Sequence, residues 1–334
     1  MRVSVFGTGQ WGTVIAQILS DAGNEVLIWG RNRDVVDEIN SIHFNSKSLP
    51  AHALPEKLTA TVDAKKAFDH SEIVILAVPA QSLRANLREW RQYISPQVRI
   101  VSAMKGVELS TLKRMTEVIH EVLGIPEAQI GILTGPNLAK EVATRQPAGA
   151  VAASTSIEFT ELIARAFSTS YFRVYTSTDV IGCELASAAK NVIALSVGMA
   201  IGMGFGENTQ SLVITRGLNE ITRLGVARGA TALTFVGLAG VGDLLATCSS
   251  PLSRNRSFGE ILGKSGSMAK ALAEVKSTVE GVTSSKAIVE LAHSVGIEVP
   301  IMEAVASVVE NSLTPQEAMV ELMKIDTGAE IEKL

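Results

Sequence analysis

The first 180 residues of the sequence alternate short apolar segments with stretches long enough to form helices. The strand candidates are RVSVF (2–6), EVLIW (25–29), EIVILAV (72–78), VRIVSA (98–103), QIGIL (129–133) and GAVAA (149–153). Strand signals end after YFRVYTSTDV (171–180), and helical periodicities follow from about Ile181 to the C-terminus. Because helices between successive strands act as crossovers, this order predicts an α/β chain: a doubly wound parallel sheet with helices on both faces, then an all-α part.

Length and composition limit the class of protein. A chain of 334 residues is longer than one hydrophobic core usually serves, so we expect two domains, residues 1–180 and 181–334. The 46% hydrophobic and 19% charged residues are typical of a globular protein. The formal charge of -4, without a basic tract, argues against nucleic acid or an anionic membrane as a partner.

Several features bear on compartment and metal content. Cys183 and Cys248 lie far apart in apolar settings, and no signal-peptide pattern opens the chain, so we expect a reduced, intracellular protein. The scattered histidines and cysteines lack metal-ligand spacing, and we expect no metal. The run VIALSVGMAIGMGFG (192–206) is shorter than the roughly 20 residues that cross a bilayer, so it predicts a buried helix without membrane insertion. Segment 41–58, which contains two prolines, predicts a surface loop.

A glycine pattern follows the first predicted strand. Gly7, Gly9 and Gly12 form G-x-G-x-x-G, with Gln10 and Trp11 inside it, just before an apolar helix. In such a turn the first glycine bends the chain, the second lets the backbone approach a pyrophosphate, and the third lets helix and strand pack closely. The sequence therefore predicts a Rossmann-like dinucleotide-binding domain.

The end of the second predicted strand bears on cofactor choice. It reads WGRNRD (29–34), with Arg31 and Arg33 where a carboxylate would bind the ribose of NAD. These arginines favour NADP over NAD. The alternative is that both are solvated residues at the start of a helix and do not contact the cofactor. Trp11 could cap the core or contact the cofactor, and its place inside the turn favours the cofactor.

Lys190 stands in unusual surroundings. In ELASAAKNVIALSVGMAIG (184–202) it and Glu184 are the only formal charges, and a buried lysine has a lowered pKa that suits proton transfer. Ser187 and Asn191 lie beside it at helical spacing, which favours a polar pocket. A lysine reaching the surface from a helix edge is the alternative.

Two turns after predicted strands supply further candidates. Lys105 comes at the carboxyl end of 98–103, where ligands bind in open parallel sheets. In LTGPNLAKEV (133–142) we expect a helix from Pro136, with the backbone amides of Gly135 and Asn137 available to a ligand.

The segment GLAGVGDLLATCSSPLSRNRSFGEIL (237–262) predicts an anion site. Asp243 is the sole acid in an apolar neighbourhood. Ser253, Arg254 and Asn255 then offer a hydroxyl, a guanidinium and an amide before a helix, a set suited to a phosphate. Arg256 adds positive charge. A serine-capped helix with solvated arginines is the alternative.

Together these motifs resemble those of one enzyme family. GTGQWGTVIA, AMKGVE, TGPNLAKEVA, AAKNVIALSVGMAIG, GENTQSLVITRGLNEITRLGVARGA and GLAGVGDLLATCSSPLSRNRSFG resemble the bacterial-type NAD(P)-dependent sn-glycerol-3-phosphate dehydrogenases, over residues 1 to about 325. The resemblance implies a cytoplasmic enzyme that interconverts dihydroxyacetone phosphate and sn-glycerol 3-phosphate for phospholipid synthesis. It also implies a homodimer.

The resemblance carries roles to individual positions. It implies that Lys190 is the catalytic acid/base, with substrate contacts at Lys105, Gly135, Asn137, Asp243, Ser253, Arg254 and Asn255. It implies cofactor contacts at Trp11, Arg31, Lys105, Ala139, Arg254 and Glu280, beside the glycine turn and Arg33. The chain departs from the usual family pattern at Ser187, Ala189 and Asn137, the last standing where many members have serine.

Two other functions fit parts of the sequence. A related 2-oxo-acid or ketone reductase would share the dinucleotide domain but would bind a carboxylate instead of a phosphate. A dinucleotide sensor would keep the glycine turn without turnover. A lysine and an aspartate in apolar runs argue against a sensor, because it needs no acid/base group.

Overall fold

The computed structural model describes residues 1–50, 52–275 and 279–325. The chain folds as two units. The first unit comprises Met1–Met104 and Lys113–Val180; the second comprises Lys105–Leu112 and the chain from Ile181 onward. The short segment Lys105–Leu112 follows a strand of the first unit, yet its Val107 is fully buried in the hydrophobic core of the second. Lys105 therefore belongs to the second unit.

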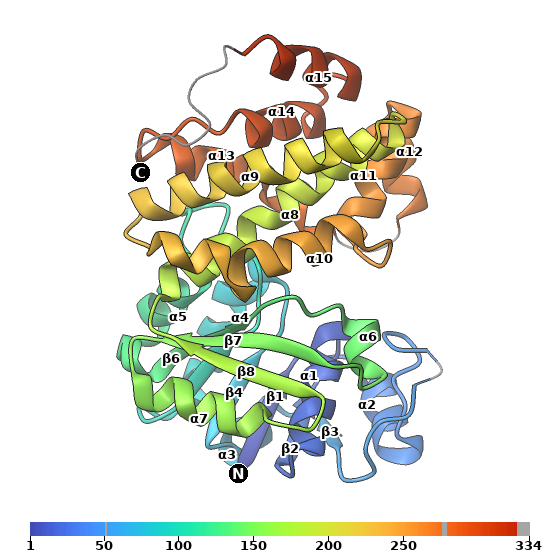
Figure 1. Cartoon of the computed structure of the whole chain (residues 1–334). Coiled ribbons are helices and arrows are strands. Elements are labelled where there is room, and N and C mark those ends of the chain that lie inside the picture. The colour runs from blue at the N-terminus through green and yellow to red at the C-terminus, as the bar shows by residue number, and fades with distance from the viewer. Residues whose placement is uncertain (51, 276–278, 326–334) are drawn as a thin grey trace. The chain divides into compact units, whose positions relative to one another are not determined.

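The first unit is built on an eight-stranded sheet of order β3-β2-β1-β4-β5-β6-β7-β8 (Figure 1). The strands are β1 (Arg2–Phe6), β2 (Glu25–Trp29), β3 (Thr59–Thr61), β4 (Ile73–Leu76), β5 (Arg99–Ser102), β6 (Ile130–Thr134), β7 (Ala148–Ser154) and β8 (Phe172–Ser177). The predicted strands are confirmed, with ends shifted by a residue or two. The three-residue β3 was not among the predicted strands because TAT carries too few apolar residues for a pattern.

The sheet is mostly parallel, as predicted, but β7 runs antiparallel to β6. Parallel neighbours need a crossover of a dozen or more residues, usually with a full helix. The connection from β6 to β7 contains the five-residue helix α6 (Ala139–Ala143) and returns the chain alongside β6. The parallel pairing resumes between β7 and β8, which are joined by the longer helix α7 (Ile157–Phe167).

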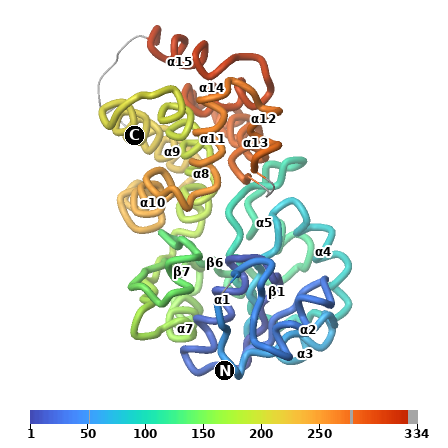
Figure 2. The backbone as a smooth tube through the Cα atoms, turned by 90° about the vertical axis from the view of Figure 1, so that its right-hand side faces the viewer, coloured from blue at the N-terminus to red at the C-terminus, as the bar shows by residue number. Residues whose placement is uncertain are grey.

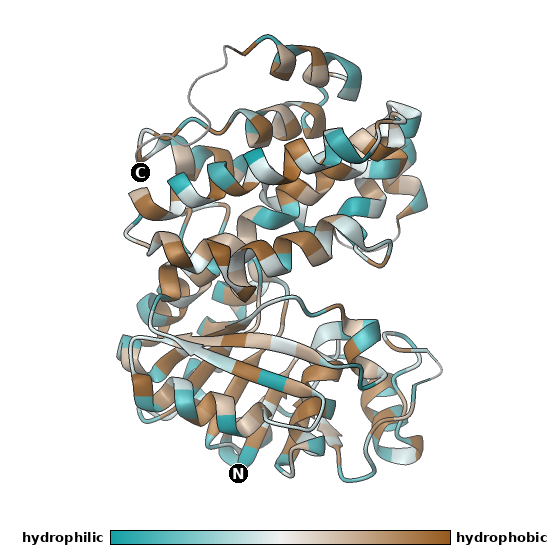
Figure 3. Cartoon of the chain, in the orientation of Figure 1, coloured by the Kyte–Doolittle hydropathy of each residue, from teal (hydrophilic) through white to brown (hydrophobic). Residues whose placement is uncertain are grey.

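Helices cover both faces of this sheet, as the alternation predicts. They are α1 (Gln10–Asp21), α2 (Arg33–Ile42), α3 (Ala64–His70), α4 (Leu83–Trp90) and α5 (Met115–Leu123), together with α6 and α7. One core joins residues of α1, α2 and α7 to the sheet, and another joins residues of α3, α4 and α5. Hydrophobic and hydrophilic residues alternate along the outer helices, such as α7, so each buries one side (Figure 3).

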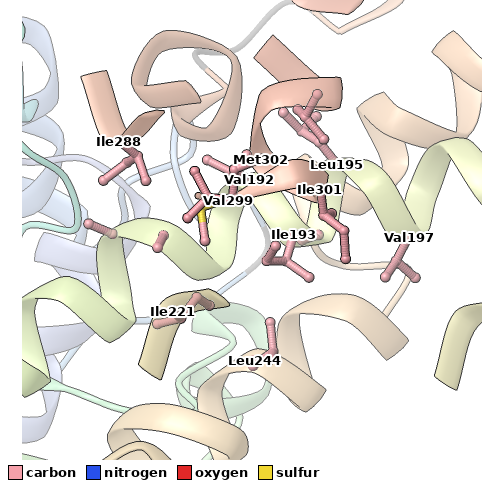
Figure 4. Close-up of a cluster of buried hydrophobic side chains, with 14 of the residues drawn as sticks. Val192, Ile193, Leu195, Val197, Ile221, Leu244, Ile288, Val299, Ile301 and Met302 are labelled. Atoms are coloured by element: carbon pink, nitrogen blue, oxygen red, sulfur yellow. The ribbon is translucent and has the colours of Figure 1, made fainter. Parts of the chain in front are cut away.

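The second unit is helical. Its helices are α8 (Val180–Gly202), α9 (Glu207–Ala227), α10 (Asp243–Ser249), α11 (Arg254–Ser265), α12 (Met268–Glu274), α13 (Glu280–His293), α14 (Pro300–Val309) and α15 (Pro315–Met323). Helix α8 lies among the others (Figure 2), and Val192, Ile193 and Leu195 on it contribute to the core drawn in Figure 4. By length and composition α8 could cross a membrane, but 89% of its apolar window is buried inside the fold, as expected of a core helix.

Glycines bring α8 and α11 into close contact. A Cβ on Gly198 or Gly202 of α8 would collide with the carbonyl oxygen of Arg256 or Glu260, respectively. A Cβ on Gly259 or Gly263 of α11 would collide in turn with backbone carbonyls of α8. The two backbones touch because neither helix carries a side chain along this line.

The segment 41–58 is mostly a loop with exposed or half-buried residues, as predicted, but four of its described residues are buried. Asn45 and Leu58 are fully buried, Leu49 and Leu54 nearly so, and Phe44 forms an isolated β-bridge with Ala53. Leu49, Leu54 and Leu58 pack into the core of the first unit, whereas Ile42 stays exposed.

Candidate functional site

The glycine turn joins β1 to α1 in the first unit. Gly7 has a φ of 130°, which a side chain would strain, and its Cβ would collide with the carbonyl oxygen of Ala77. A Cβ on Gly12 would collide with the Gly7 carbonyl. By contrast, a Cβ on Gly9 would meet nothing within 4 Å. The first and third glycines are thus required for packing, whereas the second leaves open space that suits a pyrophosphate.

The start of α1 suits an anion as well. Gly9 is the N-cap residue, and no side chain within the described residues caps this helix start. Gln10 turns its side-chain amide away, donating to the Ser48 carbonyl at 3.3 Å. Trp11 is half-buried against the core of the first unit, and its indole Nε1 has no hydrogen-bond partner among the described residues. Trp11 therefore packs on the core and still has a donor to offer.

Arg31 and Arg33 follow β2 and differ in how they are held. The Arg31 guanidinium donates to the side-chain oxygen of Asn86, which is itself buried. Arg33 is the exposed first residue of α2, whose start is capped when the Asp34 amide donates to Asn32 Oδ1. Arg31 is thus oriented by the fold, and Arg33 is solvated.

The turn after β6 holds the next candidates. Gly135 has a φ of 136°. Asn137 donates from Nδ2 to the Gly149 carbonyl at 2.9 Å, and its buried Oδ1 has no partner among the described residues. The helix expected from Pro136 begins instead at Ala139, because the chain stays extended to let Asn137 reach strand β7. Ala139, the first residue of α6, packs against the core of the first unit.

Three charged side chains meet in the second unit. Asp243, the first residue of α10, is 1% exposed. Its Oδ1 accepts from Lys190 Nζ on α8 at 2.5 Å, and its Oδ2 accepts from Lys105 Nζ at 2.8 Å. One carboxylate therefore bridges two lysines, which leaves the cluster with a net positive charge. A turn of π-helix (Leu238–Gly242) precedes Asp243, and a Cβ on its Gly240 would collide with the Phe235 carbonyl.

Burial sets the protonation behaviour of Lys190. The side chain is 5% exposed, and loss of hydration lowers its pKa to about 8. Asp243 acts in the opposite direction, and the neighbouring Lys105 ammonium lowers the pKa further. Thr247 Oγ1 accepts a second hydrogen bond from Lys190 at 2.7 Å and donates to the Asp243 carbonyl. These two bonds use two of the three donors of the ammonium.

A buried amide network continues from Lys190 along α8. Asn191 Oδ1 accepts from Asn255 Nδ2 at 2.9 Å, and Asn191 Nδ2 donates to Glu280 Oε2 at 3.3 Å. The Asn255 Oδ1 accepts from the Gly281 amide at 2.8 Å. Burial raises the pKa of Glu280, while the Arg254, Lys105 and Lys190 charges lower it. This network joins α8, α11 and α13 in one arrangement.

The residues of the S-R-N sequence at the start of α11 differ in burial and in their contacts. Ser253 is buried and caps the helix by accepting from the Arg256 amide at 3.3 Å. Arg254 is exposed and makes no hydrogen bond or ion pair with the described part of the chain. Arg256 pairs with Glu260 at 3.1 Å, so it adds no net charge, contrary to our expectation. Of the two arginines in this turn, Arg254 is thus the one available to an anionic ligand.

The structure brings Lys190, Asp243 and Lys105 together, and links Asn255 and Glu280 to them through Asn191. Sequence reasoning missed Thr247 as a partner of Lys190. A threonine one turn after Asp243 in an apolar helix gave the only signal. In residues 1–50, 52–275 and 279–325, no group of three or more His, Cys, Asp or Glu residues could hold a metal ion.

Family models and curated relatives of this chain identify one family. The family model described as NAD-dependent glycerol-3-phosphate dehydrogenase N-terminus matches residues 2–160, and the C-terminus model matches residues 179–320. The chain is 50% identical over 323 residues to a glycerol-3-phosphate dehydrogenase (NAD(P)+) from Streptomyces griseus, covering 97% of this chain and 96% of that one. It is 49% identical over 331 residues to the Corynebacterium jeikeium protein of that name, covering 99% and 100%. The crystal structure of glycerol-3-phosphate dehydrogenase from Coxiella burnetii matches with a TM-score of 0.91 at 32% identity, covering 97% of this chain and 98% of that chain.

Proposed function

Because this chain belongs to the family of NAD-dependent glycerol-3-phosphate dehydrogenases, we propose that its second unit binds dihydroxyacetone phosphate and that Lys190 protonates the substrate during reduction. The observation that carries this proposal is the buried contact of Lys190 with Asp243 and Thr247. A lysine held in this way keeps one N–H donor for a carbonyl oxygen. In the reverse direction, the neutral amine accepts the proton of the sn-glycerol 3-phosphate hydroxyl.

The neighbours of Lys190 have distinct parts in this proposal. Asp243 stabilises the ammonium form and orients it, so Lys190 remains a proton donor despite burial. Lys105 contributes positive charge next to the carbonyl oxygen as that oxygen becomes anionic. A positioned general acid contributes roughly 10²–10⁴-fold to such a rate.

Phosphate recognition falls to the start of α11 in this proposal. Arg254 is exposed and has no carboxylate partner among the described residues, so its guanidinium is available for a bidentate contact. Ser253 and Asn255 would contribute from the same turn. The family resemblance implies substrate contacts at Gly135 and Asn137 as well. The unpartnered Asn137 Oδ1 supports a hydroxyl donor as its ligand.

The first unit would hold the cofactor through Gly7, Gly9, Gln10, Trp11, Gly12, Arg31, Arg33 and Ala139. The family resemblance implies further cofactor contacts at Lys105, Arg254 and Glu280. When bound, the reduced nicotinamide supplies a hydride to the central carbon of the substrate. Arg31, fixed by Asn86, supports a preference for NADP, since arginine at this place accommodates a 2′-phosphate. We further propose that the protein is a cytoplasmic homodimer that serves phospholipid synthesis.

Initial rates of NADPH and NADH oxidation test this proposal. We expect oxidation with dihydroxyacetone phosphate and almost none with unphosphorylated dihydroxyacetone. Replacing the buried lysine (Lys190→Met) should lower turnover by about 10²-fold or more while leaving NADPH binding intact. The matched control is Lys264→Met, which changes an exposed lysine of α11. Unchanged turnover in Lys190→Met would refute the assignment of the proton donor.

A further inference from the structure

Asn45 is a fully buried polar residue in the segment after α2. Its Nδ2 donates to the Thr8 carbonyl at 2.9 Å and to Thr13 Oγ1 at 2.8 Å. Both acceptors belong to the glycine turn or the first turn of α1. The side-chain amide thus donates both of its hydrogens to the segment that we assign to dinucleotide binding.

Other bonds join the same two segments. Ser48 Oγ also donates to the Thr8 carbonyl at 2.9 Å, and the Gln10 side chain donates back to the Ser48 carbonyl. Thr13 Oγ1, which accepts from Asn45, itself donates to the Gly9 carbonyl at 2.9 Å. The carbonyls of Thr8 and Gly9, two successive residues of the turn, are therefore both fixed directly or indirectly by Asn45.

This matters because the peptide that these bonds hold lies between two glycines. Gly7 and Gly9 flank Thr8, and glycine backbones adopt more conformations than other residues. In a trans peptide the carbonyl and the following N–H point in opposite directions. Anchoring the Thr8 carbonyl toward Asn45 and Ser48 consequently turns the Gly9 N–H away from them, while a rotated peptide would present an oxygen to an anion instead.

We propose that Asn45 is a positioning residue that holds the glycine turn in the orientation required to bind the dinucleotide. The inference rests on the proposed function, because it takes NADP or NAD as the ligand of this turn. Asn45 need not touch the cofactor. It acts through the peptide between Thr8 and Gly9.

The test replaces the Nδ2 atom of Asn45 by an oxygen and leaves the shape of the side chain unchanged. Asn45→Asp sets a carboxylate against two oxygens that now receive N–H donors. The matched control is Asn24→Asp: Asn24 lies just after the other end of α1, and its Nδ2 likewise donates to two acceptors, the Leu19 and Ala166 carbonyls, at 2.8 Å each. Ser48→Ala is a milder second variant, since Ser48 is half-buried and contributes one donor to the Thr8 carbonyl.

The measurements are NADPH binding by fluorescence titration, the thermal midpoint, and KM for dihydroxyacetone phosphate. We expect Asn45→Asp to weaken NADPH binding roughly tenfold or more and Ser48→Ala to weaken it less, since each loses contacts to the same carbonyl. Asn24→Asp should lower the thermal midpoint and leave the NADPH Kd unchanged. The KM for dihydroxyacetone phosphate at saturating NADPH should stay near its original value in all three.

This design distinguishes failure of the positioning role of Asn45 from failure of the proposed function. Equal NADPH affinity in Asn45→Asp, Ser48→Ala and the Asn24→Asp control would overturn the positioning role. If Asn45→Asp does not fold, an unchanged Kd in Ser48→Ala overturns it alone. An unaltered chain that binds NADPH but does not oxidise it with dihydroxyacetone phosphate would instead count against the proposed function, and leave the effect of Asn45 on binding to stand.

Discussion

The two directions of the reaction should respond oppositely to pH, and this follows from the surroundings of Lys190. In the proposed mechanism, reduction uses the ammonium form of Lys190 as a proton donor, whereas oxidation of sn-glycerol 3-phosphate uses the neutral amine as a proton acceptor. Burial lowers the pKa of Lys190 to about 8, so the change of form falls within an accessible range. An ordinary exposed lysine would titrate about two units higher and would leave both rates flat there.

The size of the effect follows from that pKa. The ammonium fraction falls from about 91% at pH 7 to about 9% at pH 9, so kcat/KM for reduction should fall about tenfold over this interval. The neutral fraction rises by the same factor, and kcat/KM for oxidation should rise with it. The assay is absorbance of the reduced nicotinamide, followed in both directions at closely spaced pH values with saturating cofactor.

A second perturbation identifies the titrating group. The Lys105 ammonium repels that of Lys190 and lowers its pKa, so Lys105→Met should raise the pKa of Lys190 and move both inflections to higher pH. The absolute rates of this variant should fall, because Lys105 is also a proposed substrate contact. The quantity compared with the unaltered chain is therefore the pH of the inflection. Lys264→Met on the surface of α11 should leave the inflection in place.

Three outcomes would refute this reasoning. Profiles with the same slope in both directions would show that the titrating group is not the proton carrier. Flat profiles between pH 7 and 9 would show that Lys190 is not desolvated in the working enzyme. An inflection that moves to lower pH in Lys105→Met would contradict the charge interaction between the two lysines.

Two further substitutions test the packing of the second unit and the cofactor preference of the first. Gly259→Ala should lower the free energy of unfolding by about 1–3 kcal/mol, because its Cβ would collide with the Leu195 carbonyl. Chemical denaturation measures this loss. The control, Lys264→Ala on the same helix, should stay within about 0.5 kcal/mol of the unaltered chain. Equal stability of the two variants would show that α8 and α11 can separate freely. Arg31→Ala should reduce the ratio of kcat/KM for NADPH to that for NADH, as measured by initial rates with each cofactor; an unchanged ratio would assign the 2′-phosphate to another group.

The fold followed from the sequence where local patterns determine it. The apolar runs RVSVF and EVLIW formed adjacent strands, and the glycines between them formed the turn that their spacing predicts. The antiparallel β7 did not follow, because its direction depends on how the short β6–β7 connection packs. The few buried residues within 41–58 could not be predicted for a related reason: the burial of Asn45 depends on partners 37 and 32 residues earlier in the chain.

The candidate site divides in the same way. Lys190 could be singled out because a charge in an apolar helix needs an explanation, and Asp243 for the same reason. That one carboxylate serves both Lys190 and Lys105 could not be predicted, since the partners stand 53 and 138 residues apart from it in the sequence. Nor does any local pattern indicate that Lys105 leaves the strand before it and packs with the second unit.

The glycines of α8 connect the packing of the second unit to its chemistry. Lys190 and Asn191 lie in the middle of this helix, and Gly198 and Gly202 lie two and three turns further along it, against α11. Asn255, in the first turn of α11, bonds to Asn191, and Arg254 precedes it. Larger residues along this line would push α11 away from α8 and lengthen the Asn191–Asn255 bond, so the separation between the proposed proton donor and the proposed phosphate contact is set by backbone contact between the two helices. Loss of those glycines should therefore impair turnover of the phosphorylated substrate as well as stability, without any change in the residues that carry the charge.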